Sequence, residues 1–235
     1  MILYVNGDSH CTGSQAVNNH CFAEDDSTYW QLIGQRKPHP DNLAVSFGNQ
    51  LAIKLDATLI CQAEAAGSND RIIRTTKNFL KTNRPDLIVI GWSTWEREEW
   101  FDIDKNIYYQ VNCSGTDNVP KKWQYKYKKF IANIDYKDKT IANHEKIWNF
   151  HLFLEDQKIP HLFFNCYNHF FQDGPYKIEK CYEWGNSYIG PYEKELTYYF
   201  WLVNQNIQPR VSDHFGPDGH TKWADFLLPH LTKIL

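Results

Sequence analysis

The sequence has no apolar run approaching the ~20 residues that a membrane-spanning helix needs, so we expect no membrane partner. Its six cysteines form no CxxC pair and its ten histidines no HExxH motif, so we expect no metal site and no cofactor. The net charge is only -3, and without a basic field we expect no nucleic-acid partner. No segment with the pattern of a signal peptide precedes the first apolar run, so we expect a cytoplasmic protein.

Aromatic side chains, in contrast, are abundant: nine Trp, fourteen Tyr and fourteen Phe. Many of them have to lie in the core, and others can line a groove. A length of 235 residues is most simply one domain, here with an irregular insertion at about 96–139. In that insertion, residues 121–129 interleave lysines with aromatics. We favour a solvated helix face with inward aromatics over a nucleic-acid site.

Short apolar runs alternate with amphipathic segments along most of the chain, and the turns after them carry glycine. Such alternation predicts an α/β fold: a three-layer α/β/α sandwich with a central, mostly parallel sheet of flavodoxin-like topology. The expected strands are 2–5, 57–61, 87–90 and 161–165. The expected helices are Asp41 or Asn42 to about Leu55, Asp70 to about Lys81, 143–156, 193–203 and a C-terminal helix. A polar loop at about 11–41, pinned by Trp30 and Leu32, should lie beside the site.

The first apolar run ends in the stretch Asn6-Gly7-Asp8-Ser9-His10. Gly7 allows a sharp turn, and Ser9 then lies just past the end of a strand. Ligands of open α/β sheets bind outside the carboxyl ends of the strands. A serine at that place can be a nucleophile if a base is within reach, so Ser9 is the candidate nucleophile.

The candidate base lies at the other end of the chain. His214 stands in a loop directly before the C-terminal helix, where a rigid scaffold can position it. We prefer it to His220, which lies inside the start of that helix. The Gly-Asp-Ser motif and the spacing of His214, Gly219, His220 and Ala224 resemble the first and last motifs of the SGNH (GDSL) hydrolases.

The resemblance implies a site with a Ser-His-Asp triad and a three-donor oxyanion hole. The family's aspartate stands three residues before the histidine, where this chain has Val211, so Asp213 is the nearest candidate acid; a backbone carbonyl or a Ser-His dyad are the alternatives. The implied oxyanion donors are the amides of Ser9 and Gly67, and Ser93 stands where the family has asparagine. Asn69 can supply that amide instead, or can cap a helix.

These features predict a serine esterase that acts on small-molecule or glycan esters, with short acyl groups such as acetyl on a carbohydrate. The sequence has no apolar helix of the kind that forms a lid, so it does not indicate a substrate with long lipid chains. The alternative is a carbohydrate-binding or virion-associated module on a hydrolase scaffold that has lost activity. The departures at Val211 and Ser93 favour that alternative. A weaker third hypothesis is nucleic-acid binding through residues 121–129.

Overall fold

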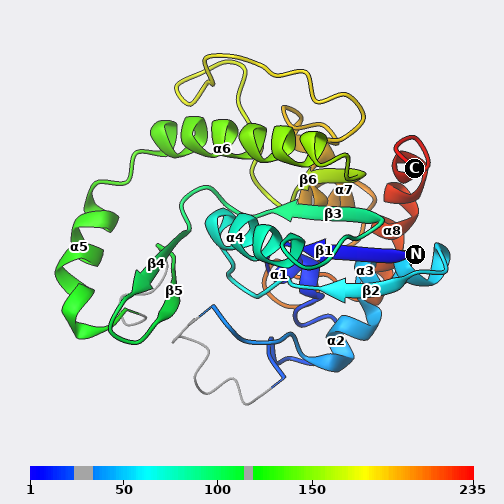
Figure 1. The fold of residues 1–235 in the computed structure, drawn as a ribbon, viewed down its shortest axis with the longest axis horizontal. Coiled ribbons are helices and arrows are strands. Elements are labelled where there is room, and N and C mark those ends of the chain that lie inside the picture. The colour runs from blue at the N-terminus through cyan, green and yellow to red at the C-terminus, as the bar shows by residue number, and fades with distance from the viewer. Residues whose placement is uncertain (24–33, 114–118) are drawn as a thin grey trace.

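A computed structural model describes residues 1–23, 34–113 and 119–235; Trp30 and Leu32 lie outside the described residues. Among these residues, four parallel strands form the central sheet in the order β2-β1-β3-β6 (Figure 1). The order places β1 beside β3 at the centre, as in flavodoxin-like sheets. The strands are β1 (Ile2–Asn6), β2 (Thr58–Cys61), β3 (Leu87–Trp92) and β6 (His161–Asn165).

Helices cover both faces of this sheet, because side chains of neighbouring residues in a strand point to opposite faces. Leu3 and Val5 of β1 pack in one buried cluster, with the helices α3 (Phe47–Lys54), α7 (Tyr198–Asn204) and α8 (Pro217–Leu231). Tyr4 packs in the other, with α4 (Asn69–Leu80) and α6 (Tyr136–Asp156). The parallel sheet between two helical layers confirms the predicted α/β/α fold.

Four expected helices begin or break elsewhere than predicted, two of them at serines. The segment expected to be one helix to Leu55 is split into α2 (Pro40–Val45) and α3 at Ser46, whose backbone is extended. The Ser46 hydroxyl accepts the amide of Asn49, so the chain restarts a helix there. Likewise, Ser68 rather than Asp70 caps α4, by accepting the amide of Arg71. Serine side chains thus decide both boundaries.

The expected helix at 193–203 is divided into a short 3-10 turn, η3 (Lys194–Leu196), and α7. The long helix α6 begins earlier than predicted, because Asp135 caps it by accepting the amides of Lys137 and Asp138. No helix formed by the described residues combines the length and apolar character needed to cross a bilayer.

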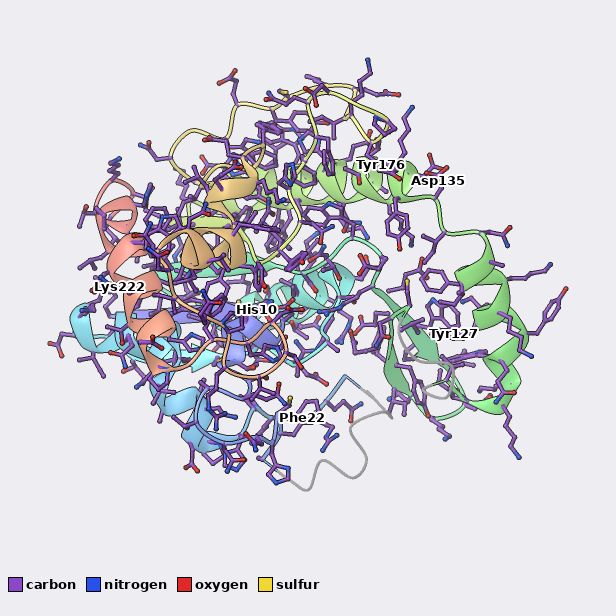
Figure 2. All side chains as sticks on the ribbon, turned by 180° about the vertical axis from the view of Figure 1, so that it is seen from behind. His10, Phe22, Tyr127, Asp135, Tyr176 and Lys222 are labelled. Carbon is purple, nitrogen blue, oxygen red and sulfur yellow. The ribbon has the colours of Figure 1, made fainter. Side chains whose placement is uncertain are left out.

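The insertion contains regular structure where the sequence predicted an irregular segment. It forms an antiparallel hairpin of β4 (Glu98–Asp102) and β5 (Ile107–Val111), followed by η2 (Lys121–Trp123) and α5 (Gln124–Ala132). We call these four elements the arm; it lies on the side of the sheet at which the strands end (Figure 1). Tyr127 of α5 is buried against the hairpin of the arm (Figure 2).

Several lysines of the arm have partners of their own. Lys122 pairs with Asp102 and Asp104, each at 2.6 Å, and Lys126 lies over the ring of Trp100 at 3.9 Å. The helix α5 is found as predicted, but its aromatics do not all pack inward: Tyr127 is buried, whereas Tyr125 is 72% exposed. The paired lysines are less available to a polyanion than the sequence pattern alone indicates.

Candidate active site

The turn after β1 places Ser9 at the carboxyl edge of the sheet. Gly7 has a φ of 155°, and a side chain there would lie 2.2 Å from Sγ of Cys11 and 2.7 Å from the carbonyl oxygen of Gly91, so only glycine fits. Asp8 then caps the short helix α1 (Ser9–Thr12), its Oδ1 accepting the amide of His10 at 3.0 Å. The sequence therefore builds a tight strand-to-helix turn with Ser9 as its first helical residue.

Ser9 keeps its hydrogen-bonding groups free. The residue is 8% exposed, and neither its hydroxyl nor its amide has a hydrogen-bond partner among the described residues. Its carbonyl, by contrast, accepts from the Thr12 hydroxyl and the Ser14 amide. The backbone of Ser9 is thus held while its reactive end remains available.

The two ends of the polypeptide meet at this turn. The ring centroids of His10 and His214 lie 5.3 Å apart, and His10 lies inside the body of the molecule (Figure 2). Arg210, four residues before His214, donates to the carbonyl oxygen of Gln15 at 2.6 Å. The structure therefore brings the segment after Ser9 against the loop that carries His214.

Gln15 orients the His214 imidazole. Nδ1 of His214 lies 2.7 Å from Oε1 of Gln15, an acceptor, so Nδ1 carries the proton and Nε2 carries the lone pair. Among the described residues, no hydrogen bond joins Nε2 of His214 to the Ser9 hydroxyl, and neither group has another hydrogen-bond partner. Contacts of this kind commonly tighten only when substrate binds.

Burial keeps His214 neutral. It lowers the pKa of His214 to about 3; the charges of His10 and Arg97 act in the same direction, and Asp8 opposes them. Burial also lowers the pKa of His10, and Asp8 and Asp213 partly offset this effect. The imidazoles of His10 and His214 are therefore both uncharged near neutral pH, as a proton acceptor has to be.

The structure does not bring Asp213 to His214 as the acid of a triad. Asp213 is exposed in the turn between Val211 and His214, which closes through the His214 amide and the Val211 carbonyl at 2.9 Å. Among the described residues no ion pair joins Asp213 to His214, and Gln15 occupies Nδ1 instead. No motif marks Gln15, because its contact spans almost the whole chain.

The turn after β2 holds two of the predicted oxyanion donors, and both are engaged elsewhere. The Gly67 amide donates to the Glu64 carbonyl at 2.9 Å. Asn69 is neither free nor the cap of α4: its Nδ2 donates to the Ser93 carbonyl at 3.2 Å and to Oδ1 of Asn143 at 2.9 Å, and its Oδ1 accepts the Ser93 amide. Asn69 therefore fastens the turn after β3.

The turn after β3 brings a cation that the sequence reading did not single out. Arg97 donates from one nitrogen, Nη1, to Oδ2 of Asp8 at 3.1 Å and to the Ser93 hydroxyl at 2.8 Å. Burial raises the pKa of Asp8, but His10 and Arg97 more than compensate and leave it lowered. An ion pair whose carboxylate is buried thus involves the residue next to Ser9. Arg97 stands in the insertion, where no motif marks it.

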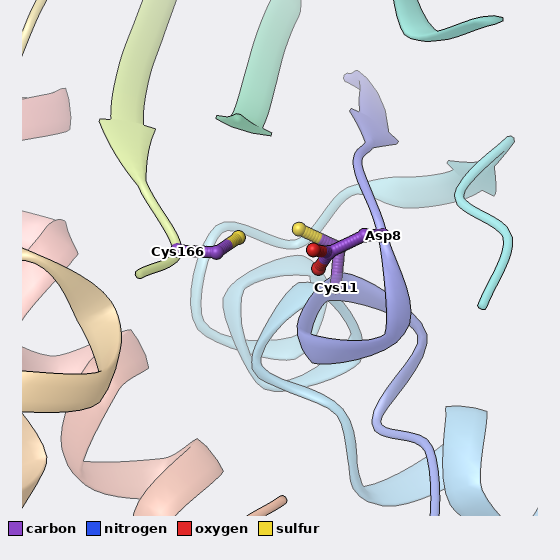
Figure 3. A group of neighbouring side chains, drawn as sticks. All are labelled: Asp8, Cys11 and Cys166. Carbon is purple, nitrogen blue, oxygen red and sulfur yellow. The ribbon is translucent and has the colours of Figure 1, made fainter. Parts of the chain in front are cut away.

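Within residues 1–23, 34–113 and 119–235, two groups of side chains have ligand atoms close enough together to hold a metal ion. The first is Asp8, Cys11 and Cys166, all buried, whose ligand atoms lie within 4.8 Å of one another (Figure 3). Burial raises the pKa of Cys166 well above its usual value, so it is a thiol rather than the thiolate that metals prefer. The second is His151, Glu155 and His161, in which the two imidazoles bond to each other at 2.8 Å.

A cavity of about 690 Å³ lies beside the end of β2. Arg36, Arg71, Arg74 and Tyr108 line it, and Ser9 and His214 are not among its described lining residues. Arg71 is paired with buried Glu64, and Arg74 with Glu99, each at 2.7 Å. The cavity is therefore separate from the serine, and two of the arginines that line it are already paired with carboxylates.

Comparisons with known proteins add a family and some distant structures. A family model described as "Family of unknown function (DUF6071)" matches residues 34–172, and no curated protein matches the sequence. An acetyl xylan esterase from Butyrivibrio proteoclasticus shares 11% identity at a TM-score of 0.41; the match covers 98% of this chain and 64% of the esterase, so this chain spans less than two thirds of its length.

Two further solved structures are similar at the same level. A protein from Desulfitobacterium hafniense assigned to the lipolytic G-D-S-L family shares 10% identity at a TM-score of 0.38, over 100% of both chains. An α/β hydrolase from the metagenome of Lake Arreo, Spain, shares 12% identity at 0.43, over 99% of this chain and 95% of that one. At TM-scores this low, the parallel sheet itself remains the basis for the fold assignment.

Proposed function

We propose that this chain, which belongs to a family of unknown function (DUF6071), is an SGNH-like serine hydrolase that cleaves esters of short acyl groups. One observation carries the proposal. An unpaired serine hydroxyl at the end of β1 lies on the segment that contacts His214, whose imidazole is neutral and held by Gln15 with Nε2 free. A nucleophile, a base and an orienting group are the elements that covalent catalysis needs.

The mechanism follows from these roles. Nε2 of His214 takes the Ser9 proton while Oγ attacks the ester carbonyl carbon, and the Ser9 amide donates to the oxyanion that forms. When the tetrahedral intermediate collapses, the ester C–O bond breaks and His214 gives its proton to the leaving alkoxide. His214 then takes a proton from a water molecule, which attacks the carbonyl carbon of the acyl-enzyme. This step releases the acid and restores Ser9.

The surroundings of Ser9 favour a small acyl group. Ser9 is only 8% exposed, and the rings of its neighbour His10 and of His214 lie against each other, which favours a short acyl chain over a long one. We propose acetyl esters of carbohydrates as the substrate class, since the many aromatic side chains suit a sugar ring. Turnover should fall as the acyl chain of a p-nitrophenyl ester lengthens from acetate to octanoate.

The test combines labelling with turnover. A fluorophosphonate probe should label the wild-type protein at Ser9, and p-nitrophenyl acetate should be hydrolysed. Ser9→Ala should abolish labelling and lower kcat by a factor on the order of 10⁴ to 10⁶. Ser187→Ala is the matched control. Ser187 makes no side-chain hydrogen bond among the described residues, and its backbone lies alongside β6.

The second candidate function is a binding module on the same scaffold without catalysis. The engaged amides of Gly67 and Asn69 favour it, because they remove two donors that the SGNH resemblance implies. If the wild-type protein is neither labelled nor active while it stays folded, the esterase proposal is wrong. Retention on acetylated glycans would then support the binding module.

A further inference from the structure

The oxyanion hole as the resemblance implies it is short of donors. The Gly67 amide and the Asn69 side chain are both engaged within the protein. The Ser93 hydroxyl is engaged as well: it accepts from Arg97, and its own hydrogen bond to the Asp8 carboxylate helps to lower the pKa of Asp8. Only the Ser9 amide remains, and a single donor stabilises a tetrahedral oxyanion poorly compared with two or three.

Arg97 reaches the same place with donors to spare. Its Nη1 is shared between Asp8, the neighbour of Ser9, and the Ser93 hydroxyl, which stands where the family has its donor. Its Nε and Nη2 have no partner among the described residues and are not buried, and the side chain is 22% exposed. The guanidinium therefore keeps Nε and Nη2 free while Nη1 holds it to Asp8, the residue before Ser9.

The turn that carries Arg97 is held rigidly. Asn69 binds both the amide and the carbonyl of Ser93, at 2.9 Å and 3.2 Å. Nδ2 of Asn143 donates to the Trp95 carbonyl at 3.1 Å, and the Trp95 ring stacks on Phe170 with centroids 4.7 Å apart. Donors fixed before the reaction stabilise charge without the cost of reorientation. These contacts give Asn69 and Asn143 a positioning role.

We propose that Arg97 is the second oxyanion donor, so that a guanidinium replaces the family's asparagine. This inference rests on the proposed ester hydrolysis. Before substrate binds, Asp8 balances the charge of the Arg97 guanidinium and holds the group by Nη1. During the reaction, the free Nε and Nη2 donate to the carbonyl oxygen of the ester as it becomes negative. Hydrogen bonds from a charged donor to an oxyanion are shorter and stronger than neutral ones, so one guanidinium can compensate for two engaged amides.

The test is the kinetics of Arg97 variants with p-nitrophenyl acetate. Arg97→Ala and Arg97→Gln should lower kcat by about 10²- to 10³-fold with a small change in KM, because the contact forms only in the transition state. Added guanidinium chloride at millimolar concentration should restore part of the kcat of Arg97→Ala. Arg84→Ala is the control, since Arg84 is an exposed arginine that binds only backbone carbonyls of Gln157 and Lys158.

A second measurement separates this role from a structural one. A short alkylboronic acid, which forms a tetrahedral adduct with an active serine, should lose affinity for Arg97→Ala by about the factor lost in kcat/KM. Wild-type kcat in a folded Arg97→Ala that is still labelled at Ser9 would overturn the inference and leave the esterase intact. So would a rise in KM alone. Absence of wild-type labelling and turnover would instead overturn the esterase proposal, and this inference with it.

Discussion

The turns that follow β1 and β2 lie at the same edge of the sheet but differ in what they leave free. After β1, the Ser9 hydroxyl and amide have no partner among the described residues. After β2, the Gly67 amide is bound to Glu64, and Asn69 is bound on three sides. A turn whose polar groups are all paired contributes rigidity, and one with unpaired groups can act on a ligand. The first turn therefore carries the chemistry, and the second supports it.

Beyond Ser9 and Arg97, the largest effect is expected at Gln15, which links the first turn to the base. Gln15→Asn tolerates the positive φ of 61° at this position but is too short to reach Nδ1 of His214. The imidazole then loses its orientation, and we expect kcat with p-nitrophenyl acetate to fall by about 10²-fold, within the range for such groups. Gln205→Asn, at an exposed position after α7, should leave kcat unchanged.

The pH profile sharpens this prediction. With a His214 pKa of about 3, the base stays neutral down to that pH, so kcat/KM should fall only at the acid end. In Gln15→Glu, a carboxylate beside Nδ1 favours the imidazolium, so the pKa rises and the acid limb moves to higher pH. An unchanged limb in Gln15→Glu would show that His214 is not the base.

A smaller effect is expected in the supporting turn. Asn69→Ala leaves the amide and carbonyl of Ser93 and Oδ1 of Asn143 without their partner in a buried place. We expect the free energy of unfolding to drop by about 2 kcal/mol, measured by urea denaturation. Ser9 labelling should persist at a lower rate, because the turn that carries Arg97 loosens. Complete loss of labelling in a folded Asn69→Ala protein would contradict the division between the two turns.

The smallest effect concerns the buried histidines away from the site. Burial lowers the pKa of His144 to about 4, from 6.5 for an exposed imidazole. The unfolded chain therefore binds this proton between pH 6.5 and about 4 while the folded protein does not, and stability falls as the pH drops through that window. His144→Phe, a ring that can pack against Phe170 and Tyr182 as His144 does, should flatten the slope of unfolding free energy against pH. His230→Phe is the comparison, at a half-buried site of α8.

Local pattern was sufficient for much of the fold. The strand at 161–165 is found as predicted, and period and turn residues place the other strands within a few positions. The hairpin of the arm was not predictable, because a five-residue strand such as Glu98–Asp102 carries charges that mask its period. The break at Ser46 likewise depends on a contact, since the Phe47 amide donates to Nδ1 of His220 far along the chain.

For the site, the sequence by itself determined the turn: Gly7 is required by its φ, Asp8 caps α1, and Ser9 follows the end of a strand. Only the tertiary structure decided the partners, namely Gln15 on His214 and Arg97 on Asp8, with the predicted donors Gly67 and Asn69 turned to internal bonds. The physical reason is range. Backbone conformation and capping act over a few neighbouring residues, whereas a hydrogen-bond partner is whichever polar atom the packing of distant segments brings within about 3 Å.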